Sequence, residues 1–437
     1  MREMKDSGIE WIGEIPATWE IIRGKYLLEY LQKPVKEDDG VITCFRDGEV
    51  TLRSNRREDG FTVSDKEIGY QGIDVGDLVV HGMDGFAGAI GISDSRGKAS
   101  PVLNVLDTRQ NKRYVMYYLR SMAYSDVFVA LATGIRVRSC DLRWNKLADL
   151  PYPIPTSGEQ RKIVEYIDAK CAEIDALTAD IQTQIDTLEQ YKRSVITEAV
   201  TKGLNPDVEM KDSGIEWIGK IPVSWSFPKI THILDYSHPY PIGDGDHGSI
   251  KSTEYKDEGI PFIRVQNLGF ATELNLENIV YISESQNETI KNSSLFPGDV
   301  LFAKTGATIG KVGIVPKEIQ IANTTSHVGK ITVSRDINSK FVFYVLASYV
   351  GYKQFWDIAA QKSTRPELSI DEIKTIHVLL PQTIEEQIEI VAYLDAKCIQ
   401  IDGAIQNKKE QLVTLDEYKK SLIYEYVTGK KEVPENA

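Results

Sequence analysis

The chain has 437 residues with a formal net charge of −13, and 42% of its residues are hydrophobic and 26% charged. This length exceeds one ordinary core and favours two or three domains, while the composition is that of a globular protein and excludes wholesale disorder. The acidic balance excludes a surface that binds a polyanion everywhere. Such a ligand must meet local patches, since basic and acidic residues nearly balance in two blocks: 19 against 19 in Glu20–Asp149, and 15 against 17 in Ser226–Val378.

A tandem duplication organises the chain. The segment MKDSGIEWIG starts at Met4 and again at Met210, and EQRKIVEYIDAKC at Glu159 returns as EQIEIVAYLDAKC at Glu386. Self-similarity at a long period marks a repeated structural unit. In the first unit the EQRK segment leads into a copy of MKDSGIEWIG, and joining the two chain ends would restore the same connection in the second. We therefore expect a pseudo-two-fold fold with its termini close together.

In chain order, residues 1–19 are predicted to form a packed surface strap, and Glu20–Asp149 is the first variable block. Short β-rich runs between glycine turns predict a compact twisted sheet in this block; they begin at Val41, Glu49 and Gly76. The glycine-dense run GFAGAIGI at Gly85 predicts a tight hairpin. A helix is predicted from Arg113 to Leu131, because its apolar residues recur with helical spacing.

The second variable block, Ser226–Val378, has the same order of predicted elements but different residues. Its run GDVLFAKTGATIGKVGIV at Gly298 occupies the place of GDLVVHGMDGFAGAIGI at Gly76. A helix predicted from Lys340 to Ala359 matches the one at Arg113. The architecture is thus expected to be shared while the surface residues differ.

The repeated segments Glu159–Ala199 and Glu386–Tyr426 carry the same heptad. The seam positions are Val164, Ile167, Cys171, Ile174, Thr178, Ile181, Ile185, Leu188, Lys192 and Val195, and in the second copy Val391, Leu394, Cys398, Ile401, Ile405, Lys408, Leu412, Leu415, Lys419 and Leu422. Five heptads in one phase indicate coiled-coil helices, each about 60 Å long. We expect the two helices to run antiparallel, with a variable domain at each end.

The residue groupings that carry catalysis or bind a metal are missing from this sequence. A phosphate loop needs four residues between its glycines and Ser or Thr after its lysine, whereas GATIGK at Gly306 has three and is followed by Val312. The glycine-rich cofactor loop and amide-proline motif of a DNA methyltransferase are also missing. The cysteines show no zinc spacing and are predicted to be reduced core residues: Cys44, Cys140, Cys171 and Cys398. The sequence therefore predicts a non-enzyme with no catalytic residue, cofactor site or metal site.

Basic and polar residues beside turns of the variable blocks are candidates for DNA contact. Arginine there can bind a guanine edge or a phosphate, although a solvated turn is the alternative for each residue. The candidates are Arg53, Arg56 and Arg57 in RSNRRED; Arg136 and Arg138 in GIRVRS; Lys304, Thr305 and Lys311 around the GATIGK turn; and Lys362, Thr364 and Arg365 in QKSTRPELS.

MKDSGIEWIGEIPATW, LPYPIPTSGEQRKIVEYIDAK and GATIGKVGIV resemble the DNA specificity subunits of type I restriction-modification systems, along essentially the whole chain. The resemblance implies two target-recognition domains, each reading one half of a bipartite site in double-stranded DNA. It also implies that the helices space these domains and dock two methyltransferase subunits, which bring S-adenosylmethionine, and that restriction subunits join the complex. The alternative is a coiled-coil scaffold that binds protein partners without reading DNA.

The expected fold class is α+β, with two globular recognition domains joined by two long antiparallel coiled-coil helices in a pseudo-two-fold repeat. The expected divisions are a strap at 1–19, recognition domain 1 at 20–155, a central helix at 156–203, a joint at 204–225, recognition domain 2 at 226–381, a C-terminal helix at 382–430 and a tail at 431–437. A signal peptide and a membrane span are missing, which predicts a cytoplasmic protein without a membrane partner.

Overall fold

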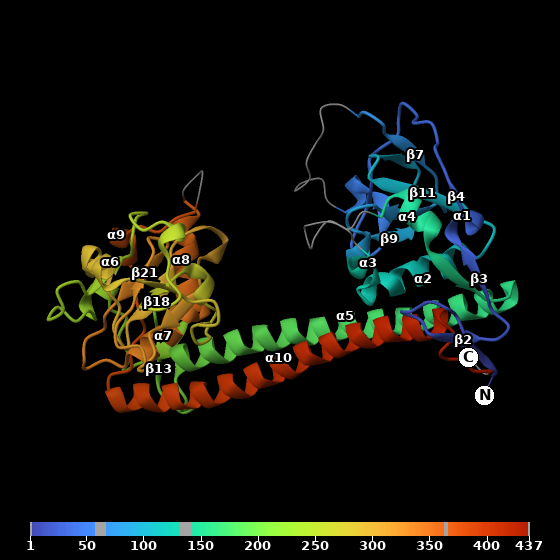
Figure 1. Ribbon diagram of the computed structural model, residues 1–437. Coiled ribbons are helices and arrows are strands. Elements are labelled where there is room, and N and C mark those ends of the chain that lie inside the picture. Colours follow the sequence, from blue (N-terminus) through green and yellow to red (C-terminus); the bar gives the residue numbers. More distant parts are fainter. Residues whose placement is uncertain (1, 57–66, 132–141, 362–365, 436–437) are drawn as a thin grey trace. The chain divides into compact units, whose positions relative to one another are not determined.

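The computed structural model describes residues 2–56, 67–131, 142–361 and 366–435. It divides into two compact units, the first made of Met1–Gln182 with Lys409–Ala437 and the second of Thr183–Lys408. Two long helices, α5 (Ser157–Lys202) and α10 (Ile384–Val427), each contribute a segment to both units (Figure 1). Each unit also contains one of the two variable blocks.

The first unit contains twelve short strands and four short helices among its described residues. The strands are β1 (Met4–Asp6), β2 (Glu14–Pro16), β3 (Glu20–Arg23), β4 (Leu28–Tyr30), β5 (Ile42–Cys44), β6 (Val50–Leu52), β7 (Gln71–Ile73), β8 (Leu78–His81), β9 (Ile90–Ile92), β10 (Gly97–Ala99), β11 (Leu103–Thr108) and β12 (Pro151–Ile154). The helices are α1 (Gly24–Leu27), α2 (Lys112–Tyr124), α3 (Val127–Ala130) and α4 (Trp144–Asp149).

The second unit contains nine strands and four short helices among its described residues. The strands are β13 (Met210–Asp212), β14 (Lys220–Pro222), β15 (Ile242–Asp244), β16 (Ile260–Ile263), β17 (Val280–Ile282), β18 (Val300–Ala303), β19 (Val312–Ile314), β20 (Asn323–Thr324) and β21 (Val328–Ile331). The helices are α6 (Glu284–Thr289), α7 (Ser339–Ala347), α8 (Tyr349–Ala359) and α9 (Ile370–Ile373).

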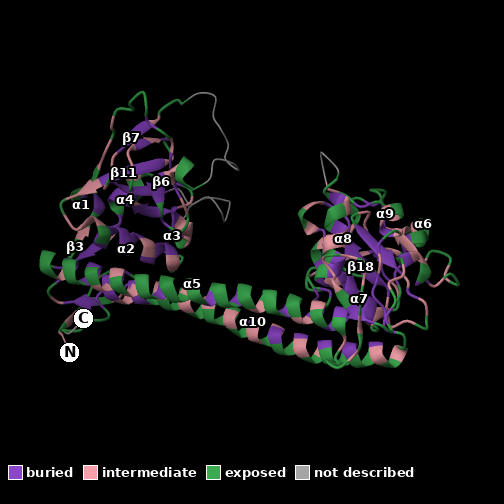
Figure 2. Ribbon diagram, turned by 180° about the vertical axis from the view of Figure 1, so that it is seen from behind, coloured by how far each residue is buried: buried purple, intermediate pink, exposed green. Residues whose placement is uncertain are grey.

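Both units are built on the same four-stranded antiparallel sheet. The strand order is β4-β11-β8-β9 in the first and β15-β21-β18-β19 in the second. The central strands β8 and β18 are apolar and buried, as Figure 2 shows for β18. An aromatic pair packs the strap residue against the domain helix in each unit: Trp19 on Tyr114 at 6.3 Å and Trp225 on Phe341 at 6.2 Å. The predicted α+β fold with a repeated unit is confirmed.

The two domain helices are interrupted, so the prediction of single helices was wrong. Asp126 adopts a left-handed conformation (φ 54°) between α2 and α3, which a short polar side chain tolerates better than most. Ser348 is extended between α7 and α8, and its hydroxyl accepts a hydrogen bond from the Val350 N–H as an N-cap. A second helix therefore starts at a point where the apolar periodicity alone predicts one continuous helix.

The run at Gly85 forms the predicted hairpin between β8 and β9, but the hairpin is not tight. A 3₁₀ turn over Gly85–Ala87 lies between the strands. Gly88 then adopts φ 94°, and a Cβ there would lie 2.6 Å from the Arg46 carbonyl oxygen. Glycine is required at this point because the backbone needs both the left-handed conformation and the close approach.

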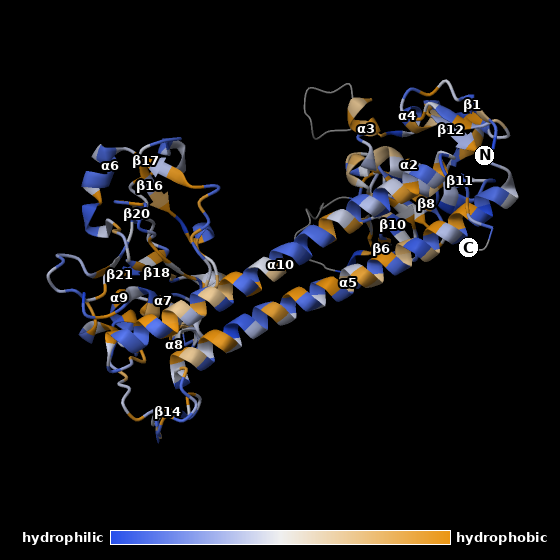
Figure 3. Ribbon diagram, turned by 90° about the horizontal axis from the view of Figure 1, so that it is seen from below, coloured by the Kyte–Doolittle hydropathy of each residue, from blue (hydrophilic) through white to orange (hydrophobic). Residues whose placement is uncertain are grey.

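The helix segments pair along the predicted seam within each unit. Cys171 and Ile181 of α5 and their counterparts Cys398 and Lys408 of α10 all lie on this seam, and the first three are buried. Hydrophobic residues recur along both helices (Figure 3). In the second unit Lys192 bonds Asp402 while Lys408 bonds Gln184, so residue numbers rise on one helix as they fall on the other. The segments are antiparallel, as predicted.

Two equivalent ion pairs cross the helix seam, one in each unit. The Lys192 ammonium lies 2.7 Å from Asp402, and the Lys419 ammonium lies 2.6 Å from Asp175. The lysines are 227 residues apart and so are the aspartates, so the duplication preserves both pairs. Polar residues at seam positions fix the register of coiled coils at some cost in stability, and we assign that role to these pairs.

We expect Asp402→Ala to lower the free energy of unfolding by about 2 kcal/mol, because it leaves the Lys192 ammonium buried without its counter-charge. The Lys192 side chain is only 5% exposed, whereas that of Lys419 is 29% exposed. The matched variant Asp175→Ala should therefore cost only about 0.5 kcal/mol, as for an exposed pair. Urea unfolding compares the two, and equal losses would contradict the role of burial.

The two ends of the chain lie together in the first unit. The Arg2 guanidinium donates to the Gly429 carbonyl at 2.8 Å, and the Lys430 ammonium donates to the Glu14 carbonyl at 2.7 Å. The Tyr424 hydroxyl donates to the Trp11 carbonyl at 3.0 Å. The strap therefore packs against the end of α10, which confirms the predicted closeness of the termini.

Three of the four cysteines are free and buried, as predicted for core residues: Cys44, Cys171 and Cys398. Burial raises the pKa of the Cys44 thiol to about 12, so it stays protonated and unreactive. Cys140 lies outside the described residues. None of the helices in the described part of the chain combines the length and apolar character needed to cross a bilayer.

Candidate nucleic-acid interface

In both units the chain returns to the same end of the central sheet after it has formed the domain helices. In the first unit the Leu142 N–H donates to the Gly82 carbonyl at 2.9 Å, one residue beyond β8. In the second the Leu368 N–H donates to the Lys304 carbonyl at 2.9 Å, one residue beyond β18. The chain thus returns to an equivalent point in both domains. We call these two places the β8 end and the β18 end.

The segments that lead into these two anchors carry five of the predicted contacts. Residues 132–141 contain Arg136 and Arg138, and residues 362–365 contain Lys362, Thr364 and Arg365. Both segments lie outside the described residues. The described residues that follow them are bonded to the β8 and β18 ends. Contact of these side chains with DNA therefore remains a prediction, whereas the points where the two segments rejoin the domains are known.

The β8 end holds an exposed arginine and a largely buried histidine that sequence reasoning missed. Arg46 has a side chain that is 68% exposed, and its guanidinium lies 2.9 Å from the Asp84 carboxylate. His81 accepts hydrogen bonds at Nδ1 from the backbone N–H groups of Met83 and Asp84, at 3.2 and 2.9 Å. Because Nδ1 accepts, the neutral ring carries its proton on Nε2. Burial lowers the pKa of His81, which favours that neutral form.

Arg53 and Arg56 lie in the turn after β6 and are engaged within the domain. The Arg56 guanidinium pairs with Asp47 at 2.7 Å and Glu49 at 3.1 Å, and it lies 4.2 Å from the centre of the Phe45 ring. Arg53 Nε donates to the Thr43 hydroxyl at 3.3 Å. Arg57 lies outside the described residues. A phosphate would have to replace the carboxylate partners of Arg56, which are half-exposed and therefore weakly held.

The β18 end places Lys304 and Thr305 inside the domain, although both were predicted as contacts. The Lys304 side chain is only 5% exposed, and its ammonium pairs with the Asp244 carboxylate at the end of β15. The Thr305 hydroxyl is buried and lies 3.4 Å from His327 Nδ1. These residues tie neighbouring loops together, and their burial leaves little surface for a ligand.

His247 and Lys311 are more accessible at the β18 end. The His247 side chain is 74% exposed and lies 3.2 Å from the other oxygen of Asp244. Lys311 is half-buried, with its ammonium 6.0 Å from the centre of the Phe270 ring. Sequence reasoning named Lys311 but not His247, because an isolated histidine in a glycine-rich run carries no signal of its own.

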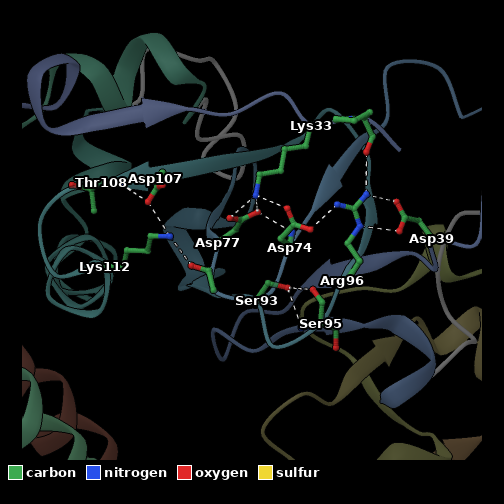
Figure 4. A network of polar contacts seen from close by, with 12 residues as sticks. Lys33, Asp39, Asp74, Asp77, Ser93, Ser95, Arg96, Asp107, Thr108 and Lys112 are labelled. Carbon is green, nitrogen blue, oxygen red and sulfur yellow. Dashed lines mark hydrogen bonds and ion pairs between the residues drawn. The ribbon is translucent and has the colours of Figure 1, made fainter. Parts of the chain in front are cut away.

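A network of charged residues holds the opposite turns of the first domain (Figure 4). Lys33 bridges Asp74 and Asp77, and Arg96 bridges Asp74 and Asp39. Hydrogen bonds from Lys33 and then Arg96 lower the pKa of the Asp74 carboxyl to about 2. Its stabilisation is therefore present above the ordinary carboxyl pKa and is lost as the pH falls towards 2. Because these cations are paired with carboxylates, the network supports the fold and offers no free positive charge.

The Gly-Asp pair shared by the two domains has a structural role. Asp77 accepts a hydrogen bond from the Asp74 N–H at 2.8 Å, and Asp299 accepts one from the Phe296 N–H at 3.0 Å. Both carboxylates close the turn that precedes the central strand. The repeat of this pair in the sequence is thus explained by turn geometry, while the residues at the strand ends are free to differ.

Comparisons with known proteins agree with this architecture. Residues 245–414 match the model of the type I restriction modification DNA specificity domain. The chain is 23% identical over 428 residues to the MjaVIII specificity subunit of Methanocaldococcus jannaschii, covering 96% of this chain and 94% of that one. It is 29% identical over 349 residues to the EcoBI specificity subunit of Escherichia coli, covering 75% and 69%.

A solved structure from a study of complex assembly in a type I restriction-modification system shares the fold, with a TM-score of 0.66 at 16% identity over 95% of this chain and 99% of that one. The chain is therefore similar, in sequence and in fold, to type I restriction-modification specificity subunits. The alternative of a scaffold that does not read DNA is not supported.

Proposed function

We propose that each recognition domain reads one half of a bipartite site in double-stranded DNA, using the β8 end in one domain and the β18 end in the other. The observation that carries the proposal is a contrast between the two copies. The strand order of the central sheet and the packing of the strap tryptophan on the domain helix recur in both units. The strand ends differ, with Arg46 and His81 in one domain and His247 and Lys311 in the other.

The proposed complex contains two methyltransferase subunits, which supply S-adenosylmethionine and the catalytic groups, and restriction subunits that join them. In it this chain binds and positions DNA without catalysing a reaction. Methylation requires the target adenine to leave the helix stack, and in this scheme the two domains fix where that happens. The pure chain should therefore not transfer a labelled methyl group to DNA.

Methylome sequencing of a host that carries this chain with its methyltransferase tests the proposal. We expect methylation at one asymmetric motif made of two defined half-sites and an unspecified spacer. A continuous motif, or methylation that does not change when this chain is deleted, would refute the assignment.

The partner surface is proposed to include two equivalent tyrosines on the long helices. Tyr191 and Tyr418 are 227 residues apart, and they are 52% and 53% exposed. Among the identical pairs of the repeated helices, these two are large aromatic rings that are more than half exposed in both copies. Tyrosine is enriched at the centre of protein interfaces.

We expect Tyr191→Ala to weaken binding of one methyltransferase copy by about 1–2 kcal/mol, and Tyr418→Ala to weaken the other equally. The double variant should lower the number of bound copies seen by native mass spectrometry at a fixed partner concentration. The exposed Leu177, at 47%, has alanine as its counterpart in α10 and serves as a control. Loss of binding in Leu177→Ala but not in the tyrosine variants would contradict this surface.

A further inference from the structure

A repeated glutamine attaches each recognition domain to its long helix. In the first unit Gln160 of α5 accepts a hydrogen bond from the Asn111 N–H at 2.9 Å, and Asn111 caps α2. In the second unit Gln387 of α10 accepts one from the Asn338 N–H at 2.9 Å, and Asn338 caps α7. Both glutamines are buried, at 1% and 3% exposure. The start of the domain helix is therefore fixed in the same way in both units.

A repeated aspartate forms a second attachment point. In the first unit Asp168 accepts hydrogen bonds from the Tyr117 hydroxyl and the Arg113 guanidinium, both at 2.5 Å. Tyr117 is buried, and burial together with the neighbouring carboxylate raises its pKa, so that it remains a donor. Hydrogen bonds to a charged group are shorter and stronger than neutral ones.

The second unit repeats this attachment with one change. Asp395 accepts hydrogen bonds from the Tyr344 hydroxyl at 2.6 Å and from the Lys340 ammonium at 2.8 Å. Lysine thus stands where the first unit has arginine, while the tyrosine and the aspartate are kept. The duplication has retained the ion pair itself rather than the identity of its cation.

The two attachment points define an angle. Gln160 and Asp168 are eight residues apart in the sequence, as are Gln387 and Asp395, which places each pair on one helix face about two turns apart. Two fixed points on the first turns of a domain helix prevent it from pivoting on the long helix. We call the two attachment points of each unit its clamp. The domain helix shares a hydrophobic core with the central strand, so the clamp also orients the strand end.

We propose that Asp168 and Asp395 are positioning residues, each of which sets the angle of one recognition domain on its helix and thereby the spacer length that the protein accepts. The inference rests on the proposed reading of a bipartite site. A domain released from its clamp still has its base-reading surface, but it can swing along the DNA. Spacer selectivity should therefore fall while the two half-site sequences stay the same.

The test is methylome sequencing of hosts that carry the complete complex with Asp168→Ala or Asp395→Ala. We expect both variants to methylate the original half-sites with the spacer lengthened or shortened by one base pair at least about ten-fold more than the natural complex does, the scale of one charged hydrogen bond. Asp180→Ala, an exposed position on α5, is the matched control. Arg113→Lys and Lys340→Arg exchange the cations that the two units already use and should keep the natural spacer.

An unchanged spacer preference in both aspartate variants would overturn the proposal, as would an equal loss at every spacer in a complex that is fully assembled. If Asp168→Ala does not fold, as judged by thermal melting, Tyr117→Phe removes one hydrogen bond and keeps the packed ring, and the same outcomes apply to it. Failure of the proposed function is distinguishable, because the natural complex would then show no bipartite motif at all.

Discussion

Replacing Arg136 and Arg138 with alanine is expected to relax one half of the methylated motif and leave the other half unchanged. An arginine that contacts a guanine edge through two hydrogen bonds contributes about 1–3 kcal/mol to discrimination against the wrong base. Both arginines lie outside the described residues, but the segment that contains them ends at Leu142, which is bonded to the β8 end. Alanine at Lys362 and Arg365 should act on the other half only.

The methylated motif of each variant, compared with that of the natural chain, measures this effect. Arg46→Ala tests a described residue at the same strand end: loss of a base contact should relax the same half as Arg136 and Arg138, whereas loss of a phosphate contact should weaken methylation of all sites without changing the motif. Lys25→Ala is a matched control, because it also removes a basic side chain of this domain. The Lys25 ammonium lies over the exposed ring of Tyr26. If both pairs of substitutions changed the same half of the motif, the assignment of these segments to separate half-sites would be wrong.

The fold was predictable from the sequence because its signals are local or repeated. A heptad that persists through Cys171 and Cys398 predicts paired helices, and a second copy of the text at Met4 predicts a repeated unit. The breaks at Asp126 and Ser348 were missed because they depend on a single backbone conformation and a single cap, which apolar periodicity does not encode. Long-range order was thus easier to predict than local interruptions.

The candidate site was less predictable, since access depends on residues far apart in the sequence. Lys304 looks like any basic residue beside a glycine turn, but Asp244, sixty positions earlier, draws its ammonium into the domain. Gln160 and Asp168 carried a signal, because both recur in the second copy. That signal does not reveal whether a repeated residue faces a partner or the chain itself, and only their contacts with Asn111 and Tyr117 decide it.

A one-heptad insertion in both long helices is expected to lengthen the spacer of the methylated motif while both half-sites stay the same. The insertion points lie between Ile181 and Ile185 in α5 and between Lys408 and Leu412 in α10, next to the boundary between the two units. Ile181 and Ile185 are buried at 5% and 3% exposure. Seven residues keep these seam positions facing their partners, because the seam repeats every seven residues.

The size of the expected change follows from helix geometry. Seven residues add about 10 Å to the helical connection between the units, and at about 3.4 Å per base pair this corresponds to a spacer about three base pairs longer. Three base pairs also rotate the duplex by about 100°, given about 10.5 base pairs per turn. The recognition domains must therefore reach their grooves from a new direction, which favours a site whose spacer satisfies both distance and rotation.

Methylome sequencing of a host that carries the inserted chain with its methyltransferase reads out every spacer at once. A two-residue insertion in both helices is the control, because it turns the following seam positions by about 200°, away from their partners, and should prevent stable pairing in both units. Since Lys192–Asp402 and Lys419–Asp175 lie on either side of the insertion points, both ion pairs should survive the seven-residue change and preserve the register in each unit. An active seven-residue variant that still methylates only the original spacer would show that the helices do not set the distance between the half-sites.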